Sequence, residues 1–182
     1  SFVSPDTGYI AYQFYENDTS YYSHTSDSGK TWTVFDTTLN YNLYDLAYKN
    51  GWGLSCGSSG GDAAIELINQ NWRIRNIIIF NEYVKISQIN IVDSNHAVFL
   101  GTNIDTSYVI GLFEKDDEQI RIVEHNVIGK SIIEKIDFFN DSTGYFVSNS
   151  VLYSTKDLGK TVEINVSKIG HFDFWSVDTG VY

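Results

Sequence analysis

The chain has 182 residues with a formal net charge of −11, and 15% of its residues are aromatic. Nucleic-acid binding is excluded because no basic patch could neutralise phosphates, and membrane insertion is excluded because no run approaches about 20 apolar residues. The single cysteine, Cys56, excludes an intramolecular disulfide and is expected to be a small buried hydrophobe. The many aromatic residues and turn formers predict an all-β fold.

Taken in chain order, apolar segments separated by turn residues predict antiparallel strands in four groups. The expected strands are 8–15, 19–25 and 30–35; 43–48, 52–56, 63–68 and 72–80; 84–91, 97–101, 107–114 and 119–127; and 132–138, 144–148, 151–154 and 161–166. No stretch shows a helical period over a dozen residues, so no helix is predicted.

The strongest signal is an internal repeat. The segment Phe2–Tyr9 returns as Phe138–Tyr145, and its Phe start and Asp-Thr-Gly ending return in Phe174–Gly180. Successive turns are separated by 40-odd residues, and a period of about 40–50 residues with four short strands is typical of propeller blades. We therefore predict one β-propeller domain over 1–182, with four-stranded antiparallel blades. The expected repeats are 2–42, 43–88, 89–135, 136–171 and a partial fifth at 172–182.

About four blades and the beginning of a fifth leave two interpretations open. The chain is either a very small propeller or a piece of a larger one. We favour the piece, because a sheet that ends in an open edge is an aggregation hazard that native proteins cover. Further blades or a partner chain would provide that cover.

Two turns share a motif of Thr, Asp, Gly and Thr at alternate positions. The residues are Thr25, Asp27, Gly29, Thr31 and Trp32 in the first copy, and Thr155, Asp157, Gly159 and Thr161 in the second, where Val162 replaces the aromatic. The Asp side chain can accept hydrogen bonds from backbone N–H groups two residues on, and glycine can adopt the positive φ that such a turn needs. Trp32 is expected to start the outer strand and to pack between strands or blades. We predict that these residues are structural.

This motif resembles the Asp-box, or BNR, repeat. Together with the Asp-x-Thr-Gly-Tyr strand start, the chain is similar to the propeller repeats of Ycf48-like and sortilin-like proteins. The resemblance implies a propeller fold across nearly the whole chain and says little about function. It also implies an extracytoplasmic location, secreted or periplasmic.

The sialidases that often carry Asp boxes need three arginines from different blades to clamp a carboxylate. The chain has three, but Arg73 and Arg75 lie two residues apart, and Arg121 is the third. The family's Arg-Ile-Pro element is absent. The four histidines show no metal-ligand spacing, and Gly57–Gly61 lacks the Lys-Ser/Thr ending of a phosphate loop. No catalytic residue, metal or cofactor is therefore predicted.

Two functions remain as hypotheses. The first is a non-catalytic interaction module that binds a protein or a glycan through a propeller face. The second is part of a sialidase-like glycoside hydrolase whose catalytic residues lie outside this chain. Aromatic residues are enriched at recognition surfaces. The candidate binding aromatics are Tyr15, Tyr21, Tyr22, Tyr41 and Trp52, although each is also a candidate for the core.

Overall fold

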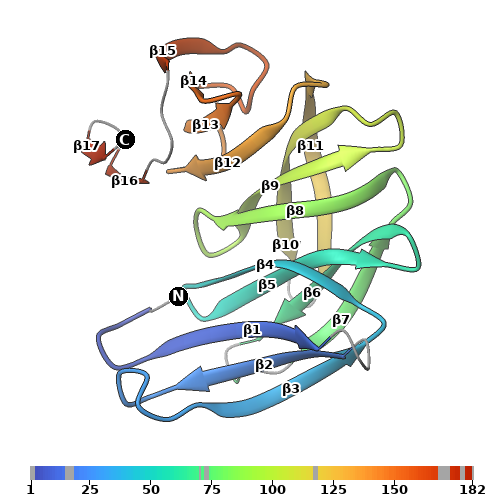
Figure 1. Cartoon of the computed structure of the whole chain (residues 1–182), viewed down its shortest axis with the longest axis vertical. Coiled ribbons are helices and arrows are strands. Elements are labelled where there is room, and N and C mark those ends of the chain that lie inside the picture. The colour runs from blue at the N-terminus through green and yellow to red at the C-terminus, as the bar shows by residue number, and fades with distance from the viewer. Residues whose placement is uncertain are drawn as a thin grey trace.

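The computed structural model describes residues 3–14, 19–69, 71, 74–116, 119–167, 173–176 and 179–181. All regular structure in these ranges is β-strand (Figure 1). The strands are β1 (Gly8–Phe14), β2 (Thr19–Thr25), β3 (Thr33–Leu39), β4 (Asn42–Lys49), β5 (Trp52–Ser59), β6 (Asp62–Ile68), β7 (Ile74–Phe80), β8 (Tyr83–Ile91), β9 (His96–Asn103), β10 (Tyr108–Asp116), β11 (Gln119–Gly129), β12 (Ile133–Phe138), β13 (Gly144–Ser148), β14 (Val151–Thr155), β15 (Glu163–Ser167), β16 (Asp173–Ser176) and β17 (Thr179–Val181). Within the described ranges, no helix is long and apolar enough to cross a membrane.

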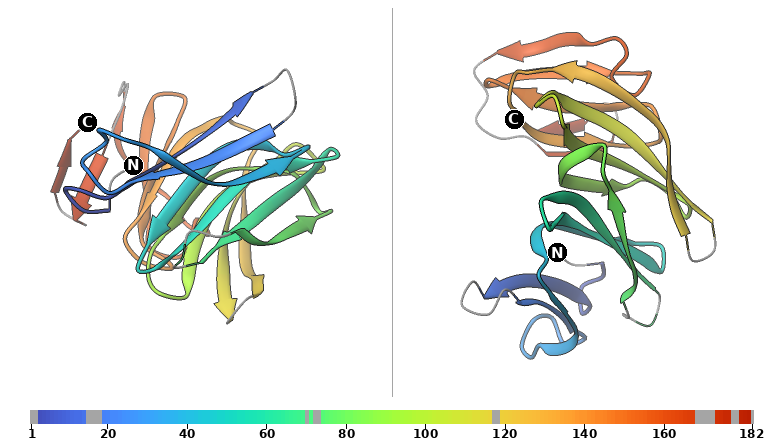
Figure 2. Two further views of the ribbon diagram at one scale, coloured as in Figure 1. Left: turned by 90° about the horizontal axis from the view of Figure 1, so that it is seen from below. Right: turned by 90° about the vertical axis from the view of Figure 1, so that its right-hand side faces the viewer.

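The strands form successive antiparallel meanders. Three sheets have four strands each, in the orders β4-β5-β6-β7, β8-β9-β10-β11 and β12-β13-β14-β15. The first sheet has only β1-β2-β3, and β16 pairs with β17. The sheets follow one another in chain order along an arc (Figures 1 and 2). The first strand of each four-stranded sheet lies on the inner side of this arc.

The predicted strands are found, and they end within a few residues of the expected positions. The largest shift is in the first sheet, where β3 begins at Thr33 rather than at Lys30, because the preceding residues belong to a tight turn. The expected repeat boundaries at 88/89 and 135/136 fall inside β8 and β12. The sequence repeat is clearest at the turn that follows each inner strand. The repeat units therefore begin within a sheet's first strand and not at the boundary between two sheets.

Apolar side chains fill the space between the second, third and fourth sheets. Between the second and third sheets, Phe99 and Phe113 stack with ring centroids 4.2 Å apart. Between the third and fourth sheets, Ile110, Phe138 and Phe146 belong to a second cluster. Cys56 is fully buried and unpaired in the first cluster, which confirms its expected role. Burial of these faces is the main term that stabilises the stack.

Polar side chains on the inner strands tie neighbouring sheets together. The Asp45 carboxylate of β4 accepts a hydrogen bond of 2.9 Å from the Ile89 amide of β8. One sheet further on, Gln88 accepts from the Ile136 amide at 2.9 Å, and Asn90 accepts from the Phe138 amide at 3.1 Å. Each inner strand thus satisfies backbone donors of the next, where no strand-to-strand pairing exists.

The interface between the first two sheets is polar instead. The Glu66 side chain on β6 is fully buried and accepts hydrogen bonds from Tyr22, from Thr38 and, at 2.7 Å, from Ser55. Tyr22 and Thr38 come from the first sheet, while Ser55 and Glu66 come from the second. The Tyr41 hydroxyl joins the same network through Ser55. A buried carboxyl is tolerated here because its donors come from both sheets.

Glu66 predicts a specific pH dependence of stability. Burial raises the pKa of the Glu66 carboxyl above its ordinary value of 4.5, and the three hydrogen bonds offset only part of that rise. Its contribution to stability is therefore full below pH 4.5 and is lost as the pH rises through the folded-state pKa. Glu66→Gln should remove this loss, so that the melting temperature of the variant falls less over that pH interval. Equal slopes for both proteins in thermal melts would contradict the assignment.

Candidate functional site

The two motif turns have nearly identical hydrogen bonding. The Asp27 carboxylate accepts from the Thr31 amide at 2.9 Å and from the Thr31 hydroxyl at 2.6 Å, while the Thr25 hydroxyl accepts from the Gly29 amide at 3.0 Å. In the second turn, the bonds of Asp157 to Thr161 measure 2.8 and 2.7 Å. The bonds from Thr31, together with one that the Thr25 hydroxyl donates to the Asp27 carboxylate at 2.7 Å, lower the pKa of Asp27 to about 2. The assignment of these turns to the Asp-box family stays a prediction.

Glycine is required at one position of each turn. Gly29 and Gly159 have φ values of 82° and 86°, in the left-handed region that favours glycine. Trp32 differs from its expected packing, because its side chain is 39% exposed and its indole N–H donates to the Gly29 carbonyl at 3.1 Å. The Trp32 side chain therefore closes the turn, and the outer strand begins after it.

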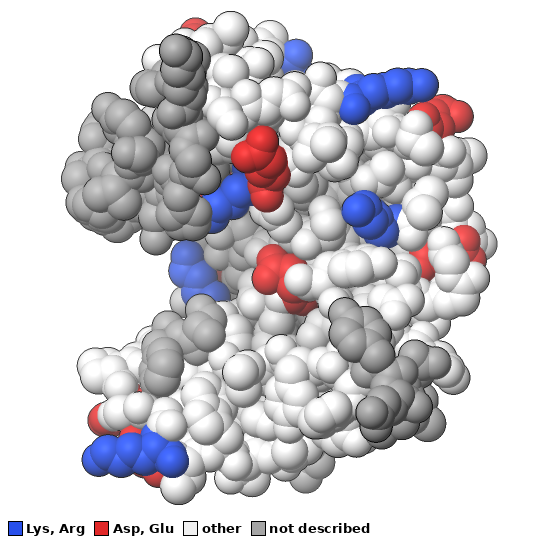
Figure 3. All heavy atoms as spheres, in the orientation of Figure 1, with Lys and Arg blue, Asp and Glu red and all other residues white. Residues whose placement is uncertain are grey.

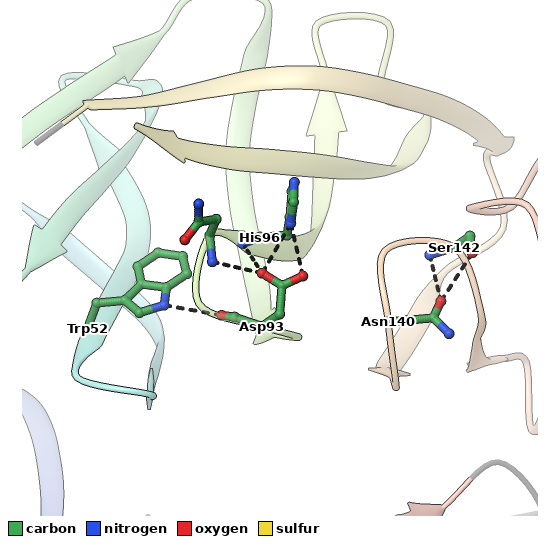
Figure 4. Close-up of polar contacts among 6 residues, drawn as sticks. Trp52, Asp93, His96, Asn140 and Ser142 are labelled. Carbon is green, nitrogen blue, oxygen red and sulfur yellow. Dashed lines mark hydrogen bonds and ion pairs between the residues drawn. The ribbon is translucent and has the colours of Figure 1, made fainter. Parts of the chain in front are cut away.

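These turns lie against the turns that follow the inner strands. The Ser28 amide donates to the Asp6 carbonyl, and the Leu158 amide donates to the Ser142 carbonyl, both at 2.9 Å. The inner-strand turns are closed by short side chains (Figure 4): Asn140 accepts from the Ser142 amide, and Asp93 accepts from the His96 amide and contacts its imidazole. These side chains accept hydrogen bonds from nearby backbone N–H groups, so they stabilise the turns.

The candidate binding aromatics are mostly interior. Tyr22, Tyr41 and Trp52 are 0%, 1% and 4% exposed, so they do not form a recognition surface. Tyr22 and Tyr41 belong to the polar network around Glu66, and the Trp52 indole donates to the Asp93 carbonyl (Figure 4). Tyr21 is half-buried and stays a candidate. Tyr15 lies outside the described residues.

A groove runs between β1 and β4 on the inner side of the arc. Its volume is about 500 Å³, and it is lined by Tyr9–Gln13 of β1 and Leu43–Leu46 of β4. A smaller hollow of about 270 Å³ shares Tyr9 and Leu46 with it and extends to Ile89–Ile91 of β8. In Figure 3 the molecule is hollowed on its left side, and neither sign of charge gathers into a patch on that face. We take the groove between β1 and β4 as the candidate functional site.

Apolar and aromatic side chains border this groove. Ile10 and Tyr44 line it and are 44% and 48% exposed, and Phe14, at the end of β1, is 54% exposed. Tyr12 stacks on Tyr21 with ring centroids 5.5 Å apart, and Phe14 meets Tyr21 edge-on at the same separation. Such a cluster of exposed apolar groups along one groove is typical of a binding surface.

The groove also follows a strand edge. Among the described residues, β1 pairs only with β2, and the groove lies along the edge of β1 that faces away from β2. The Tyr9 hydroxyl reaches from β1 to β4, where it accepts from the Tyr48 amide at 2.8 Å. This bond resembles the tie that Asn90 makes to the next inner strand. The Tyr9 side chain of β1 thus makes a hydrogen bond to β4 of the kind that an inner strand makes in the other sheets.

Sequence reasoning did not identify this groove. The first predicted group has three strands where the others have four, and that difference was the available signal. In the structure, Gly8 is the first residue of β1 after a turn, as Gly144 is the first residue of β13. The turn before each glycine has the same bond, from Val3 to Thr7 at 2.9 Å and from Phe139 to Thr143 at 3.0 Å. Strand β1 therefore corresponds to a second strand, and no inner strand of the first sheet is found among the described residues.

In the described part of the chain, no group of three or more His, Cys, Asp or Glu side chains is placed to hold a metal ion. Arg121 is mostly exposed and paired with Glu114, whereas Arg73 and the side chain of Arg75 lie outside the described residues. Glu66 and Asp45, whose carboxyl pKa values are raised by burial, already accept protein hydrogen bonds.

No protein-family model and no curated protein matches the sequence. Among solved structures, a proposed 6-phosphogluconolactonase from Bacteroides fragilis matches with a TM-score of 0.63 and 12% identity, over 93% of this chain and 58% of that one. The fold is that of a β-propeller. This chain spans just under three-fifths of that propeller's length. Identity at this level indicates the fold alone and transfers no activity.

Two further proteins match more distantly. Oligopeptidase B from Leishmania major has a TM-score of 0.49 and 11% identity, over 92% of this chain and 28% of its own. Ycf48 from Cyanidioschyzon merolae has a TM-score of 0.41 and 14% identity, over 90% and 76%. A Ycf48 structure bound to a D1 peptide has a TM-score of 0.28 and 12% identity, over 99% and 94%. These similarities are too distant to support any further conclusion.

The motif turns generate a stability prediction. The Thr155 side chain is 3% exposed, and its hydroxyl accepts from the Gly159 amide at 2.8 Å. Thr155→Val keeps the shape but leaves that amide without its acceptor, which should lower the unfolding free energy by about 1–3 kcal/mol. Thr37→Val, at an exposed position of β3, is the matched control. Denaturant unfolding that shows equal losses for both variants would refute a structural role for the turn.

Proposed function

We propose that this chain is a non-catalytic protein-binding module that recognises an extended polypeptide segment along β1. The observation that carries the proposal is the groove along the edge of β1 that faces away from β2, where no strand pairing is found among the described residues. Free backbone donors and acceptors along a strand favour another strand, because main-chain hydrogen bonds supply affinity without demanding a particular sequence. Side-chain pockets beside the edge then supply the selectivity.

The dimensions of the groove support this mode of binding. Strand β1 offers seven residues, Gly8–Phe14, which is a usual length for a strand partner. Ile10 on β1 and Tyr44 on β4 line the groove and are well exposed. A bound strand would place alternate side chains against these groups and would bury them.

Recognition of a protein is favoured over catalysis by the state of the acidic groups. The buried carboxyls of Glu66 and Asp45 are occupied by hydrogen bonds that hold sheets together. A glycosidase would need two free carboxyls across a substrate bond. Glycan binding and an extracytoplasmic location stay predictions that rest on the motif resemblance alone.

A peptide-display selection tests the proposal. We expect the folded chain to enrich peptides with apolar residues at alternate positions and without proline. Ile10→Asp should weaken the binding of the enriched peptides by at least tenfold in calorimetry, because the charge would be buried under the added strand. Ile164→Asp, on the outer strand β15 at a side chain that is 71% exposed, should bind as the unchanged protein does. Peptides that bind all three proteins equally would contradict the assigned groove.

A further inference from the structure

The junction between the first and second sheets differs in kind from the later junctions. Neither of the two hydrophobic clusters in the described chain contains a residue of β1, β2 or β3. Ser20 and Tyr22 of β2, each 0% exposed, instead use their hydroxyl groups to bond the Tyr41 carbonyl and the Glu66 carboxyl. Because apolar burial is the main term that holds the other sheets together, this junction depends more strongly on its hydrogen bonds.

Glu66 is the acceptor on which the bonds from both sheets converge. One carboxyl oxygen accepts from the Thr38 hydroxyl of β3. The other accepts from the Tyr22 hydroxyl of β2 and, at 2.7 Å, from the Ser55 hydroxyl of β5. All three donors are neutral hydroxyl groups, so none of them balances the charge of an ionised carboxylate. The arrangement therefore suits a protonated Glu66 better than a charged one.

The titratable groups packed around Glu66 come from β2, β3, β5 and the residue that precedes β4. Burial raises the pKa of the Glu66 carboxyl, and the negative charge of Asp36 on β3 raises it further. Tyr22, Tyr41 and Cys56 also have pKa values raised by burial, so all three stay neutral when Glu66 ionises. Ionisation of Glu66 thus places a second negative charge near Asp36 in a buried junction.

Separation of the first sheet would return Glu66 to water, where its carboxyl has the ordinary pKa of 4.5. Below pH 4.5 the carboxyl is protonated in the closed and the open state, so pH leaves the opening equilibrium unchanged. Above pH 4.5 only the open state ionises, and the opening constant grows by up to about tenfold per pH unit. The constant levels off once the pH exceeds the folded-state pKa, because both states are then charged.

The next junction is less sensitive to pH. Asp45, whose pKa is also raised by burial, lies between the second and third sheets and accepts from the Ile89 and Leu46 amides. The same two sheets are also joined by the apolar cluster that contains Phe99 and Phe113. Apolar burial does not change with the charge of Asp45, so this cluster continues to hold the sheets together. The first sheet is therefore the part expected to separate.

We propose that Glu66 is a pH-sensitive switch, which holds the first sheet against the second while it is protonated and allows that sheet to separate locally when it ionises. The groove between β1 and β4 is divided by this opening, because one of its walls comes from each sheet. The inference goes beyond the proposed function, since it concerns the junction between the sheets and requires no ligand.

Hydrogen exchange of β2, followed by mass spectrometry between about pH 4 and pH 8, tests the inference on the unchanged chain. At each pH the exchange rate is divided by that of Glu66→Gln, which cancels the intrinsic pH dependence of exchange. We expect the ratio for Thr19–Thr25 to rise at least tenfold with pH and then to level off, while the ratio for Gly144–Ser148 stays constant. Asp62→Asn, at an exposed position of the same strand as Glu66, is the control and should exchange as the unchanged chain does.

A constant ratio for β2 would overturn the inference. A ratio that rises equally for β2 and β13 would overturn it too, because the whole molecule would then unfold and no single sheet would separate.

A second variant keeps the test decisive where Glu66→Gln fails to fold. The ratio of β2 to β13 exchange within one protein also cancels the intrinsic pH dependence. In Thr38→Val this ratio should level off at a higher pH than in the unchanged chain, because Glu66 has lost a donor that lowers its pKa. An unchanged or lower levelling pH would contradict the assignment. No peptide is added in these experiments, so their outcome is independent of the peptide-binding proposal.

Discussion

The whole structure depends on the covering of one sheet by the next. A four-stranded meander cannot bury its hydrophobic face alone, so each sheet is stabilised by its neighbours. The second, third and fourth sheets achieve this with two apolar clusters, in which Phe99 and Phe146 are almost fully buried. The first interface differs, because Glu66, Tyr22 and Ser55 form a hydrogen-bonded network there. A polar interface fixes one relative arrangement of the two sheets, since its donors and acceptors match in few orientations.

Hydrogen bonds between the inner strands also hold neighbouring sheets together. Asp45, Gln88 and Asn90 bind backbone amides of the following inner strand, so the row of inner strands is linked from one sheet to the next. At the first sheet the tie comes from β1, where the Tyr9 hydroxyl accepts from the Tyr48 amide of β4 and the Gln13 side chain donates to Asn42. The candidate site is the groove beside this tie. The properties of the site follow from the position of β1 beside β4, where the other sheets have an inner strand.

The sequence was informative where local chemistry decides the structure. The turns at Asp27 and Asp157 need an acceptor and a glycine at fixed spacing. Both turns could therefore be located in the sequence, together with the strands on either side of them. It was less informative where burial depends on distant strands. Tyr22 and Tyr41 could not be assigned to the interior, because their partners Glu66 and Ser55 lie up to 44 residues away. The groove could not be predicted from the sequence either, because recognising it requires β1 to be aligned with second strands such as β13.

The central claim is that the inner edge of β1 takes an added strand. Hydrogen exchange of Gly8–Phe14, followed by mass spectrometry with and without a peptide enriched in the display selection, tests it most directly. The account predicts fast exchange of the amides on that edge in the free protein and protection that grows as the peptide is added, while β13 stays protected throughout. Protection of β1 that is complete without peptide, or absent at saturating peptide, would contradict it.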